Sequence, residues 1–324
     1  MDVIGLDRIK EAVQTIDLLP VIEAGFVAYA AGKAVVPPVG ELVFREPPGD
    51  VHIKYGYLTD DAYYVIKIAS GFYENPALNL PSSNGLMLLF SRQTGALLSM
   101  LLDEGYLTDL RTAVAGAIAA RYLAPRRVHR IGVVGTGTQA RLQLRYLTRV
   151  TDCRDAVVWG RQQDRLMRYR EDMTAEGFTI AMTQDMDDVA ASCNLIVTTT
   201  ASTTPLIQAG QLRRGTHVTA VGADTPEKQE LDPALLGEAD LVVADSRAQC
   251  VVRGEIAHAV RGGVLDRQDL VELGEILAGS ARGRTSDDQI TVADLTGVAV
   301  QDIQIAKAVY EAVRTEPMNE EETA

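Results

Sequence analysis

The sequence predicts an α/β protein with two parts, a doubly wound, Rossmann-type parallel sheet and a second, α+β domain. From Arg130 onward, short apolar runs alternate with helical patterns, as in a parallel sheet wound by helices. Before Arg130, the runs alternate in polarity between turns rich in proline and glycine, as antiparallel strands do. A last helical pattern at 301–313 is expected to return to the first part. Residues 1–124 and 299–324 are therefore assigned to the α+β domain, and residues 125–298 to the parallel-sheet domain.

Each element before Arg130 follows from a local pattern. Asp17 precedes apolar residues at helical spacing and is expected to cap a helix. Pro47-Pro48-Gly49 separates alternating runs that predict strands, and the turn at 92–95 predicts a hairpin. Thr108 is expected to open a helix of small residues that can pack close to a neighbour. The predicted strands are 51–57, 62–69, 86–90 and 96–102.

After Arg130, each short apolar run between helical patterns is a predicted parallel strand. Residues 290–297 are expected to close this sheet. The acidic tail Glu316–Ala324 is expected to fray. The other predicted strands are 131–134, 156–159, 179–182, 195–199, 218–221 and 241–243.

Composition excludes several classes of protein. The chain has 324 residues, 47% of them hydrophobic, which allows one large or two ordinary domains with real cores. Its net charge of -13, without any basic run, argues against a nucleic-acid partner, because phosphate backbones need a concentrated basic face. No segment approaches the roughly eighteen unbroken apolar residues of a membrane span, and the start of the chain lacks signal-peptide features. We expect a soluble, cytoplasmic protein without a membrane partner.

The cysteines and histidines indicate no metal site. Cys153, Cys193 and Cys250 are widely spaced and form no C-x-x-C pair, so neither a disulfide framework nor a zinc site is expected. The histidines fall at no metal-ligand spacing, and none is singled out as catalytic. They are His52, His129, His217 and His258.

A glycine turn joins an apolar strand to a helix at Gly135-Thr136-Gly137-Thr138-Gln139-Ala140. Gly135 permits the tight turn, Gly137 lets the backbone approach phosphate groups, and Ala140 is small where helix packs on strand. The helix N-terminus, with Thr138 and Gln139, would face the anion. The segment predicts a nicotinamide dinucleotide site, and the alternative is a strand-to-helix turn without a ligand.

The end of the second parallel strand bears on the choice of cofactor. An acidic residue there would hold the ribose 2′-hydroxyl of NAD, whereas an arginine would accept the 2′-phosphate of NADP. Gly160-Arg161 supplies an arginine, and the first carboxylate is Asp164. This favours NADP(H), with NAD(H) possible, unless Arg161 is only a solvated loop residue.

Three cations are candidate ligands for a substrate anion. Arg111 falls in the first turn of the helix predicted from Thr108, where the helix dipole disfavours a cation unless an anion is near. It could grip a substrate carboxylate or a cofactor phosphate, or form a surface salt bridge. Lys67 interrupts an apolar strand, and a buried lysine needs an anionic partner unless it reaches solvent. Lys54 is a less distinctive candidate of the same kind.

Asp224 is the candidate for proton transfer. It follows the carboxyl end of a predicted parallel strand, the edge at which open α/β sheets bind ligands. It could exchange a proton with an amine. The alternative is a turn or helix-capping aspartate ahead of Pro226.

Lys67 and four sequence segments that follow it, taken together and in order, resemble the ornithine cyclodeaminase and mu-crystallin family. The resemblance covers nearly the whole chain. Three further stretches, Ile53-Lys54, Ser70-Gly71-Phe72-Tyr73 and Asp294-Leu295-Thr296-Gly297, are similar to the ectoine-utilisation branch of that family. Any one segment is common, but the ordered set is specific. The segments are Lys67, 107–113, 135–140, 221–231 and 297–302.

The resemblance implies a nucleotide domain and a dimerising, substrate-binding domain built from both chain ends. It implies that Lys67 and Arg111 hold a substrate carboxylate and that Asp224 handles the substrate nitrogen; Thr112, next to Arg111, is assigned to the cofactor. Many members carry an arginine just after the proline near the start of the first sheet, whereas Pro37-Pro38-Val39-Gly40 has none. Ornithine is therefore not specified as the substrate, and Lys54 is a candidate to compensate.

The resulting hypothesis is an NAD(P)-dependent enzyme that moves a hydride at the α-carbon of an amino acid or its imine. Imine reduction, amino-acid oxidation and oxidative cyclisation with ammonia loss share this chemistry, and the sequence does not choose among them. The alternative is a dinucleotide-binding protein without turnover, as in mu-crystallin. The presence of both Lys67 and Asp224 favours catalysis.

Overall fold

The computed structural model describes residues 1–72 and 74–315, so Tyr73 and the acidic tail from Glu316 lie outside the described residues. The chain divides into two compact units. The first holds Met1–Arg111 and the chain from Ala299 onward, and the second holds Thr112–Val298. The domain boundaries given above stay a prediction.

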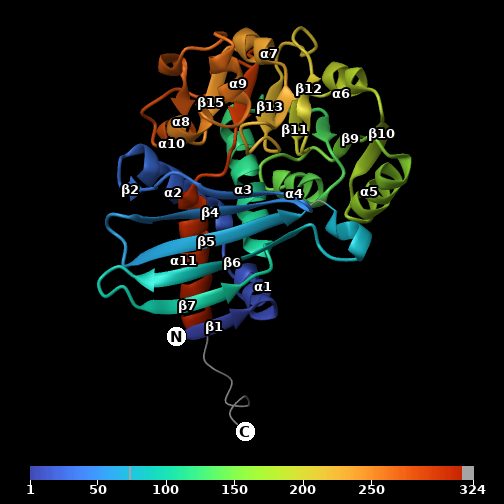
Figure 1. The fold of residues 1–324 in the computed structure, drawn as a ribbon. Coiled ribbons are helices and arrows are strands. Elements are labelled where there is room, and N and C mark those ends of the chain that lie inside the picture. Colours follow the sequence, from blue (N-terminus) through green and yellow to red (C-terminus); the bar gives the residue numbers. More distant parts are fainter. Residues whose placement is uncertain (73, 316–324) are drawn as a thin grey trace. The chain divides into compact units, whose positions relative to one another are not determined.

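The first unit is built on a mainly antiparallel sheet. Its elements are β1 Asp2–Gly5, α1 Leu6–Gln14, α2 Leu18–Ala30, β2 Ala34–Val35, β3 Gly40–Arg45, β4 Pro48–Leu58, β5 Tyr63–Phe72, the 3-10 helix Asn75–Leu78, β6 Ser83–Ser91, β7 Leu97–Leu102 and α11 Ala299–Thr315. The strand order is β1-β7-β6-β5-β4-β2, and β3 also pairs with β4. Within this sheet, only β1 and β7 run parallel. Figure 1 shows α11, in red, crossing one face of the sheet.

The core of the first unit lies around α11. This helix packs against α1, α2, β4, β5 and β6. Ile22 and Phe26 of α2 are fully buried, and Gly25 allows close approach, since a Cβ there would lie 2.9 Å from Cγ of Gln304. Among the described residues, no single helix is long and apolar enough to cross a membrane; only α1 and α2 taken together, bent by 93°, reach that length and composition.

Two helix starts differ from the sequence expectations. The helix expected to open at Thr108 is α3, Tyr106–Leu123, and it begins two residues earlier. The reason is Asp103, whose Oδ2 accepts the backbone N–H of Leu107 at 2.8 Å and so caps the helix from further upstream. Asp17 does stand at the N-cap of α2, but its side chain makes no capping hydrogen bond. β1, α1, β2 and β3 have no counterpart among the predicted elements.

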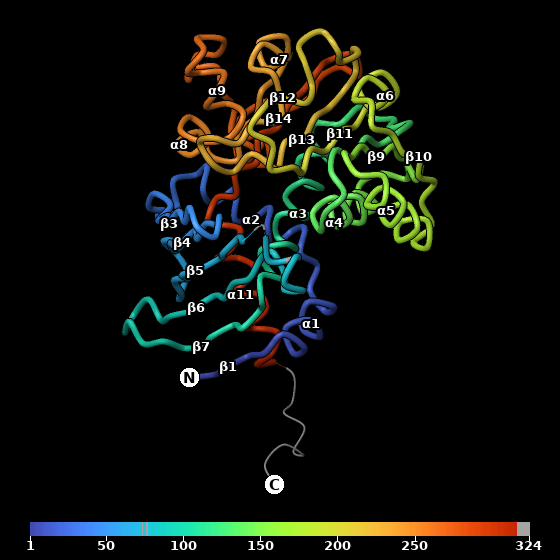
Figure 2. Tube along the Cα trace, turned by 45° about the vertical axis from the view of Figure 1, so that its right-hand side comes forward, coloured from blue at the N-terminus to red at the C-terminus, as the bar shows by residue number. Residues whose placement is uncertain are grey.

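The second unit is a doubly wound parallel sheet, as predicted. Its elements are β8 Ile131–Val134, α4 Thr138–Leu147, β9 Asp155–Trp159, α5 Gln163–Ala175, β10 Thr179–Thr183, α6 Met186–Ser192, β11 Leu195–Thr198, β12 Thr203–Ile207, β13 His217–Ala220, β14 Gln229–Leu231, α7 Pro233–Glu238, β15 Leu241–Ala244, α8 Arg247–Cys250, α9 Glu255–Arg261, the 3-10 helix Arg267–Asp269, β16 Val271–Glu272, α10 Leu273–Leu277 and β17 Thr291–Asp294. The order is β10-β9-β8-β11-β13-β17-β15-β16, and every pair is parallel. Figures 1 and 2 both show α5 and α6 beside the β9 and β10 end, which they contact.

Strand order is where the sequence expectation for this sheet fails. β17, expected to close the sheet, lies in its interior between β13 and β15. An apolar run identifies a strand but not its neighbours, because order depends on where each crossover returns. The short strand β16 and the separate parallel pair β12 and β14 are also absent from the predicted elements.

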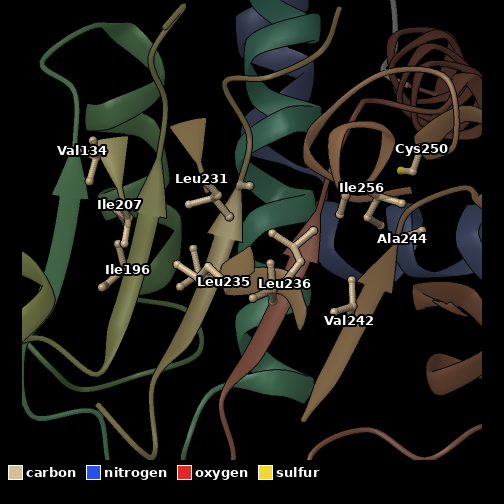
Figure 3. Close-up of a cluster of buried hydrophobic side chains, with 14 of the residues drawn as sticks. Val134, Ile196, Ile207, Leu231, Leu235, Leu236, Val242, Ala244, Cys250 and Ile256 are labelled. Atoms are coloured by element: carbon tan, nitrogen blue, oxygen red, sulfur yellow. The ribbon is translucent and has the colours of Figure 1, made fainter. Parts of the chain in front are cut away.

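The core of the second unit explains why its strands are mostly apolar. Strands of a parallel sheet are covered on both faces, so all four residues of β8, β11 and β13 are buried. Figure 3 shows one such layer, in which Leu235 and Leu236 of α7 and Ile256 of α9 lie over strand residues such as Val242. Short helices thus complete the core.

His217 is a buried polar residue within this sheet. Its ring nitrogens lie 2.8 Å from Oγ1 of Thr291 and 2.9 Å from Oγ1 of Thr219. Burial, helped by the charge of Arg284, lowers the pKa of His217 from 6.5 to about 3. The ring is therefore neutral in the folded protein and has a structural role.

The pKa of His217 makes the protein acid-sensitive. Because the folded state takes up this proton less readily than the unfolded state, the contribution of His217 to stability is present above pH 6.5 and is lost as the pH falls toward 3. Between pH 7 and pH 5 we expect it to lower the free energy of unfolding by about 2 kcal/mol. Urea titrations of wild-type protein and His217→Gln measure this. Equal pH dependence in the two proteins would contradict the assignment.

Candidate functional site

Two buried cations of the first unit share one buried carboxylate. Nζ of Lys67, on β5, lies 3.5 Å from Oδ2 of Asp302, and Nε of Arg111, on α3, lies 3.1 Å from Oδ1 of the same residue on α11. The side chains of Lys67, Arg111 and Asp302 are 2%, 6% and 1% exposed. Charges so deeply buried need each other, because an unpaired ion in a protein interior costs several kcal/mol. The structure thus brings Lys67 and Arg111 together.

Several polar atoms of this group have unused hydrogen-bonding capacity. Arg111 donates from Nη1 to Oε1 of Gln301 at 3.1 Å. Among the described residues, neither oxygen of Asp302, nor Nε2 of Gln301, nor Nε of Arg111 has a hydrogen-bond partner of good geometry. Buried polar atoms are rarely left so in proteins, and such a cluster is typical of a site that a polar ligand completes.

The helix-dipole argument for Arg111 does not hold. Because α3 begins at Tyr106, Arg111 lies in its second turn, where the dipole has little effect. The surface salt bridge considered for Arg111 is also excluded, since the residue is 5% exposed and faces Asp302. Its significance comes from burial beside a carboxylate, which the local sequence does not reveal.

Two further charges lie close to Lys67. Lys54, on β4, is directly opposite Lys67 in the antiparallel register and is only 4% exposed. Residues opposite each other share a face of the sheet. Burial raises the pKa of Asp103, while the charge of Lys67 acts to lower it. The region therefore concentrates positive charge and offsets it with two acids, Asp103 and Asp302.

The glycine turn of the second unit has the predicted form. Gly135 has φ of +121°, and a Cβ there would lie 2.5 Å from Oγ1 of Thr199. Gly137 is the N-cap of α4, which begins at Thr138 and has no side-chain cap. A Cβ at Gly137 would meet nothing within 4 Å, so the helix N-terminus is open there. Ala140 is fully buried, as packing of helix on strand requires.

Neighbouring residues brace this turn. Nη1 of Arg141 donates to the backbone oxygen of Thr136 at 2.6 Å, and its Nη2 pairs with Asp172 at 2.6 Å. Nε2 of Gln143 donates to the backbone oxygen of Thr112 at 3.1 Å. The small residues of α3 do allow close packing, since a Cβ at Gly116 would lie 1.9 Å from Oε1 of Gln143. Gln139 is partly exposed.

Arg161 is exposed just after β9, and its backbone oxygen accepts a hydrogen bond from Gln184. Its side chain is therefore in a position to meet a ligand or solvent.

Asp224 lies in the loop between β13 and β14, in the second unit. Nζ of Lys228 donates to its Oδ1 at 2.6 Å, and Arg253 donates to its backbone oxygen at 3.2 Å. Its side chain is 34% exposed. The carboxylate is thus held by a cation yet open enough to meet a ligand.

Three residues important in these arrangements are not among the predicted site residues. Gln301 and Asp302 occur in the sequence segment 297–302, but their meeting with Arg111 requires α11 to return to the first sheet. Glu230 lies in the segment after Asp224 and binds two loops of the second unit. Because β14 is the short sequence Gln229-Glu230-Leu231 and not an apolar run, no local pattern identifies Glu230.

Known proteins match these features over almost the whole chain. The model of the ornithine cyclodeaminase/mu-crystallin family matches residues 2–316. An uncharacterized cyclodeaminase of Sinorhizobium fredii is 42% identical, covering 91% of this chain and 90% of its own length.

Two solved structures share the fold. An archaeal alanine dehydrogenase dimer with bound NAD has a TM-score of 0.89 at 34% identity, over 97% of this chain and 96% of that chain. The Δ1-pyrroline-2-carboxylate reductase of Thermococcus litoralis, in complex with NADH and L-proline, has a TM-score of 0.91 at 27% identity, over 97% and 98%. From these matches and the motifs that it carries, the chain belongs to the ornithine cyclodeaminase/mu-crystallin family.

Proposed function

We propose that this protein is an NAD(P)-dependent oxidoreductase that acts at the α-carbon of an amino acid or its imine, with the substrate carboxylate bound by Lys67 and Arg111. The observation that carries the proposal is the group around Asp302, where two buried cations share one carboxylate and buried polar atoms remain unsatisfied. A substrate carboxylate would supply acceptor oxygens for two of these atoms, Nε of Arg111 and Nε2 of Gln301. Lys54 adds positive charge on the same sheet face.

The second unit fits a nicotinamide dinucleotide. Gly135, Gly137, Thr138, Gln139 and Ala140 form a turn whose backbone is accessible at Gly137 and leads into a helix N-terminus. When bound, the dinucleotide supplies or accepts the hydride. Thr112 and Arg161 are further candidate contacts. NAD or NADH is present in the two solved relatives described above.

Asp224 is proposed to exchange a proton with the substrate nitrogen. Nζ of Lys228 lies 2.6 Å from Oδ1 of Asp224 and orients the carboxylate, and a carboxylate can accept a proton from an amine. In the direction of imine reduction, the protonated carboxyl group would return that proton to nitrogen. Imine reduction, amino-acid oxidation and cyclisation with ammonia loss all need this step.

Substitutions should separate the two roles. Asp224→Asn is expected to lower kcat by about a hundredfold or more, because general acid-base catalysis contributes roughly 10²- to 10⁴-fold. Lys67→Met and Arg111→Met are expected mainly to raise KM, by about tenfold or more, because hydrogen bonds to charged groups contribute about 1.5–3 kcal/mol. Steady-state kinetics on the best substrate measures both.

A control is available in each of the two units. Glu227→Gln makes the same kind of change in the Asp224 loop, and Lys33→Met removes an exposed lysine of the first unit. Both should leave kcat and KM near wild type. Near-normal kcat in Asp224→Asn would show that Asp224 is only a turn residue.

For the cofactor, we propose a preference for NADPH over NADH. Arg161→Asp should lower the ratio of the NADH to the NADPH dissociation constant by about tenfold or more and could invert the preference. The reason is that a charge-assisted contact to the 2′-phosphate would be lost. Fluorescence titration with both cofactors measures this, with Arg170→Asp on the exposed side of α5 as control. Equal affinities in the wild-type protein would refute the preference.

We further propose a homodimer. Leu42, Val43 and Phe44 on β3 are 54%, 72% and 41% exposed, and exposed apolar strands usually mark a contact surface. The archaeal alanine dehydrogenase is a dimer. Light scattering should give twice the chain mass of 35.0 kDa, and Val43→Lys should shift the protein toward monomer. A wild-type mass of one chain at micromolar concentration would exclude the dimer.

The second candidate, a dinucleotide-binding protein without turnover, is favoured by the same glycine turn. Screening amino acids, and keto acids with amines, for a change in reduced nicotinamide absorbance separates the two. Tight cofactor binding with no turnover on any substrate would favour this candidate.

A further inference from the structure

Three loops meet at the carboxyl edge of the sheet in the second unit. They follow β8, β11 and β13, and they carry Gly135, Thr199 with Thr200, and Gly222. A Cβ at Gly222 would lie 2.1 Å from the backbone oxygen of Thr200, so the β11 and β13 loops touch backbone to backbone. Oγ1 of Thr199 in turn donates to the backbone oxygen of Val134, at the start of the glycine turn. Displacement of one loop would therefore disturb the others.

Glu230, on β14, ties two of these loops together. Its Oε1 accepts the backbone N–H of Thr200 at 2.5 Å, and its Oε2 accepts the backbone N–H of Gly222 at 2.9 Å. The hydroxyl of Thr198, at the end of β11, donates to Oε2 at 2.7 Å. Glu230 is fully buried. One carboxylate thus uses each of its oxygens to hold a different loop.

A second buried acid holds Glu230 in place. Glu255, the first residue of α9, accepts the backbone N–H of Glu230 at 2.7 Å and that of Leu231 at 3.0 Å. Oδ2 of Asp294, at the end of β17, accepts the backbone N–H of Ile256 at 2.8 Å. The placement of Glu230 is therefore set by α9, which is itself fixed to the large sheet.

We propose that Glu230 is a positioning residue, which fixes the β13 loop that carries Asp224 relative to the β11 loop that packs on the glycine turn. The inference rests on the proposed function, because it assigns Glu230 a role through Asp224 and the cofactor turn. Asp224 lies two residues after Gly222, so release of the Gly222 amide frees the segment that carries the carboxylate. Glu230 itself is fully buried and acts through these loops.

The proposal predicts a pH dependence of its own. Burial raises the pKa of Glu230 from 4.5 to about 7. The titratable groups whose charges reach it are Glu255 on α9 and Asp294 on β17, and burial raises the pKa of each. Protonation places a hydrogen on one of the two oxygens and weakens its bond to a loop amide. Loop order should therefore decrease as the pH falls from 8 to 6.

The contribution of Glu230 to the free energy of unfolding should respond in the opposite direction. Because the folded state holds the Glu230 proton more tightly than the unfolded state, the contribution of this group to stability falls as the pH rises from about 4.5 to about 7. If Glu230 acted only in folding, loop order would decrease with rising pH together with the contribution of Glu230 to stability. If Glu230 positions the loops, loop order should increase with rising pH while that contribution to stability decreases.

Glu230→Gln tests the proposal with nearly unchanged shape. An amide has one acceptor oxygen, so it can hold Thr200 or Gly222 but not both, and its NH₂ group faces the other N–H. We expect hydrogen-exchange protection of the Thr200 or Gly222 amide to fall by about tenfold or more, as for loss of a hydrogen bond to a charged group. With the best substrate, kcat of Glu230→Gln should fall by at least a similar factor. In the wild-type protein, kcat should decrease between pH 8 and pH 6 as the loops lose order, and this decrease should be absent in the variant.

Ile207→Val is the matched control. Ile207 is a fully buried apolar residue of β12 and is paired with Leu231 of β14. It should lower thermal stability without changing loop exchange or the pH profile of kcat. Equal loop exchange in Glu230→Gln and wild type, or an unchanged decrease in kcat at low pH, would overturn the proposal.

Hydrogen exchange of the wild-type protein at two pH values tests the proposal without any variant. After correction for intrinsic exchange rates, protection of the Thr200 and Gly222 amides should fall between pH 8 and pH 6, and constant protection would overturn the proposal even if Glu230→Gln does not fold. These exchange measurements need no turnover. If no substrate is turned over, the proposed function fails, while the exchange data still decide whether Glu230 positions the loops.

Discussion

The constraint on which the first unit depends is the burial of Lys67 and Arg111 beside a single carboxylate. Asp302 joins β5, α3 and α11, which are distant in sequence, and neither cation could stay buried without it. This explains why α11 belongs to the first unit although the whole parallel sheet precedes it in the chain. The same group is suited to a ligand carboxylate, because such a carboxylate would add acceptors for Nε of Arg111 and Nε2 of Gln301, which lack them.

In the second unit, the corresponding constraint is the parallel direction of every strand. Parallel strands bring their carboxyl ends to one edge, so the loops with Gly135, Thr200 and Gly222 meet there. Short loops in such contact need backbone partners, and Glu230 supplies them for two loops at once. The cost is a buried carboxylate, whose pKa is raised to about 7. Burial of the Glu230 carboxylate lowers the stability of the protein but fixes the β11 and β13 loops, and such local costs are common at functional sites.

Local patterns identify much of this fold, because its parallel strands are mostly apolar runs and its glycine turn has a recognisable sequence. The structure has the expected strand at 131–134 and the expected tight turn at Gly135. It also buries Ala140 where helix packs on strand. What local patterns miss depends on distant residues. Arg111 looks like a helix-terminus cation until Asp103 is seen to start α3 earlier, and Asp302 gains its partners only when α11 crosses the first sheet. The place of β17 inside its sheet is a property of the crossovers rather than of any strand.

We propose that hydride moves between a nicotinamide and the α-carbon of a substrate whose carboxylate is held by Lys67 and Arg111. The most direct measurement uses NADPH deuterated at either face of nicotinamide C4, together with α-keto acids and ammonia or a primary amine, or with a cyclic imine carboxylate. Mass spectrometry and NMR then locate the deuterium in the product. We expect deuterium at the α-carbon of an amino acid, from one of the two deuterated cofactors only. Cofactor binding without deuterium transfer to any of these substrates would contradict it.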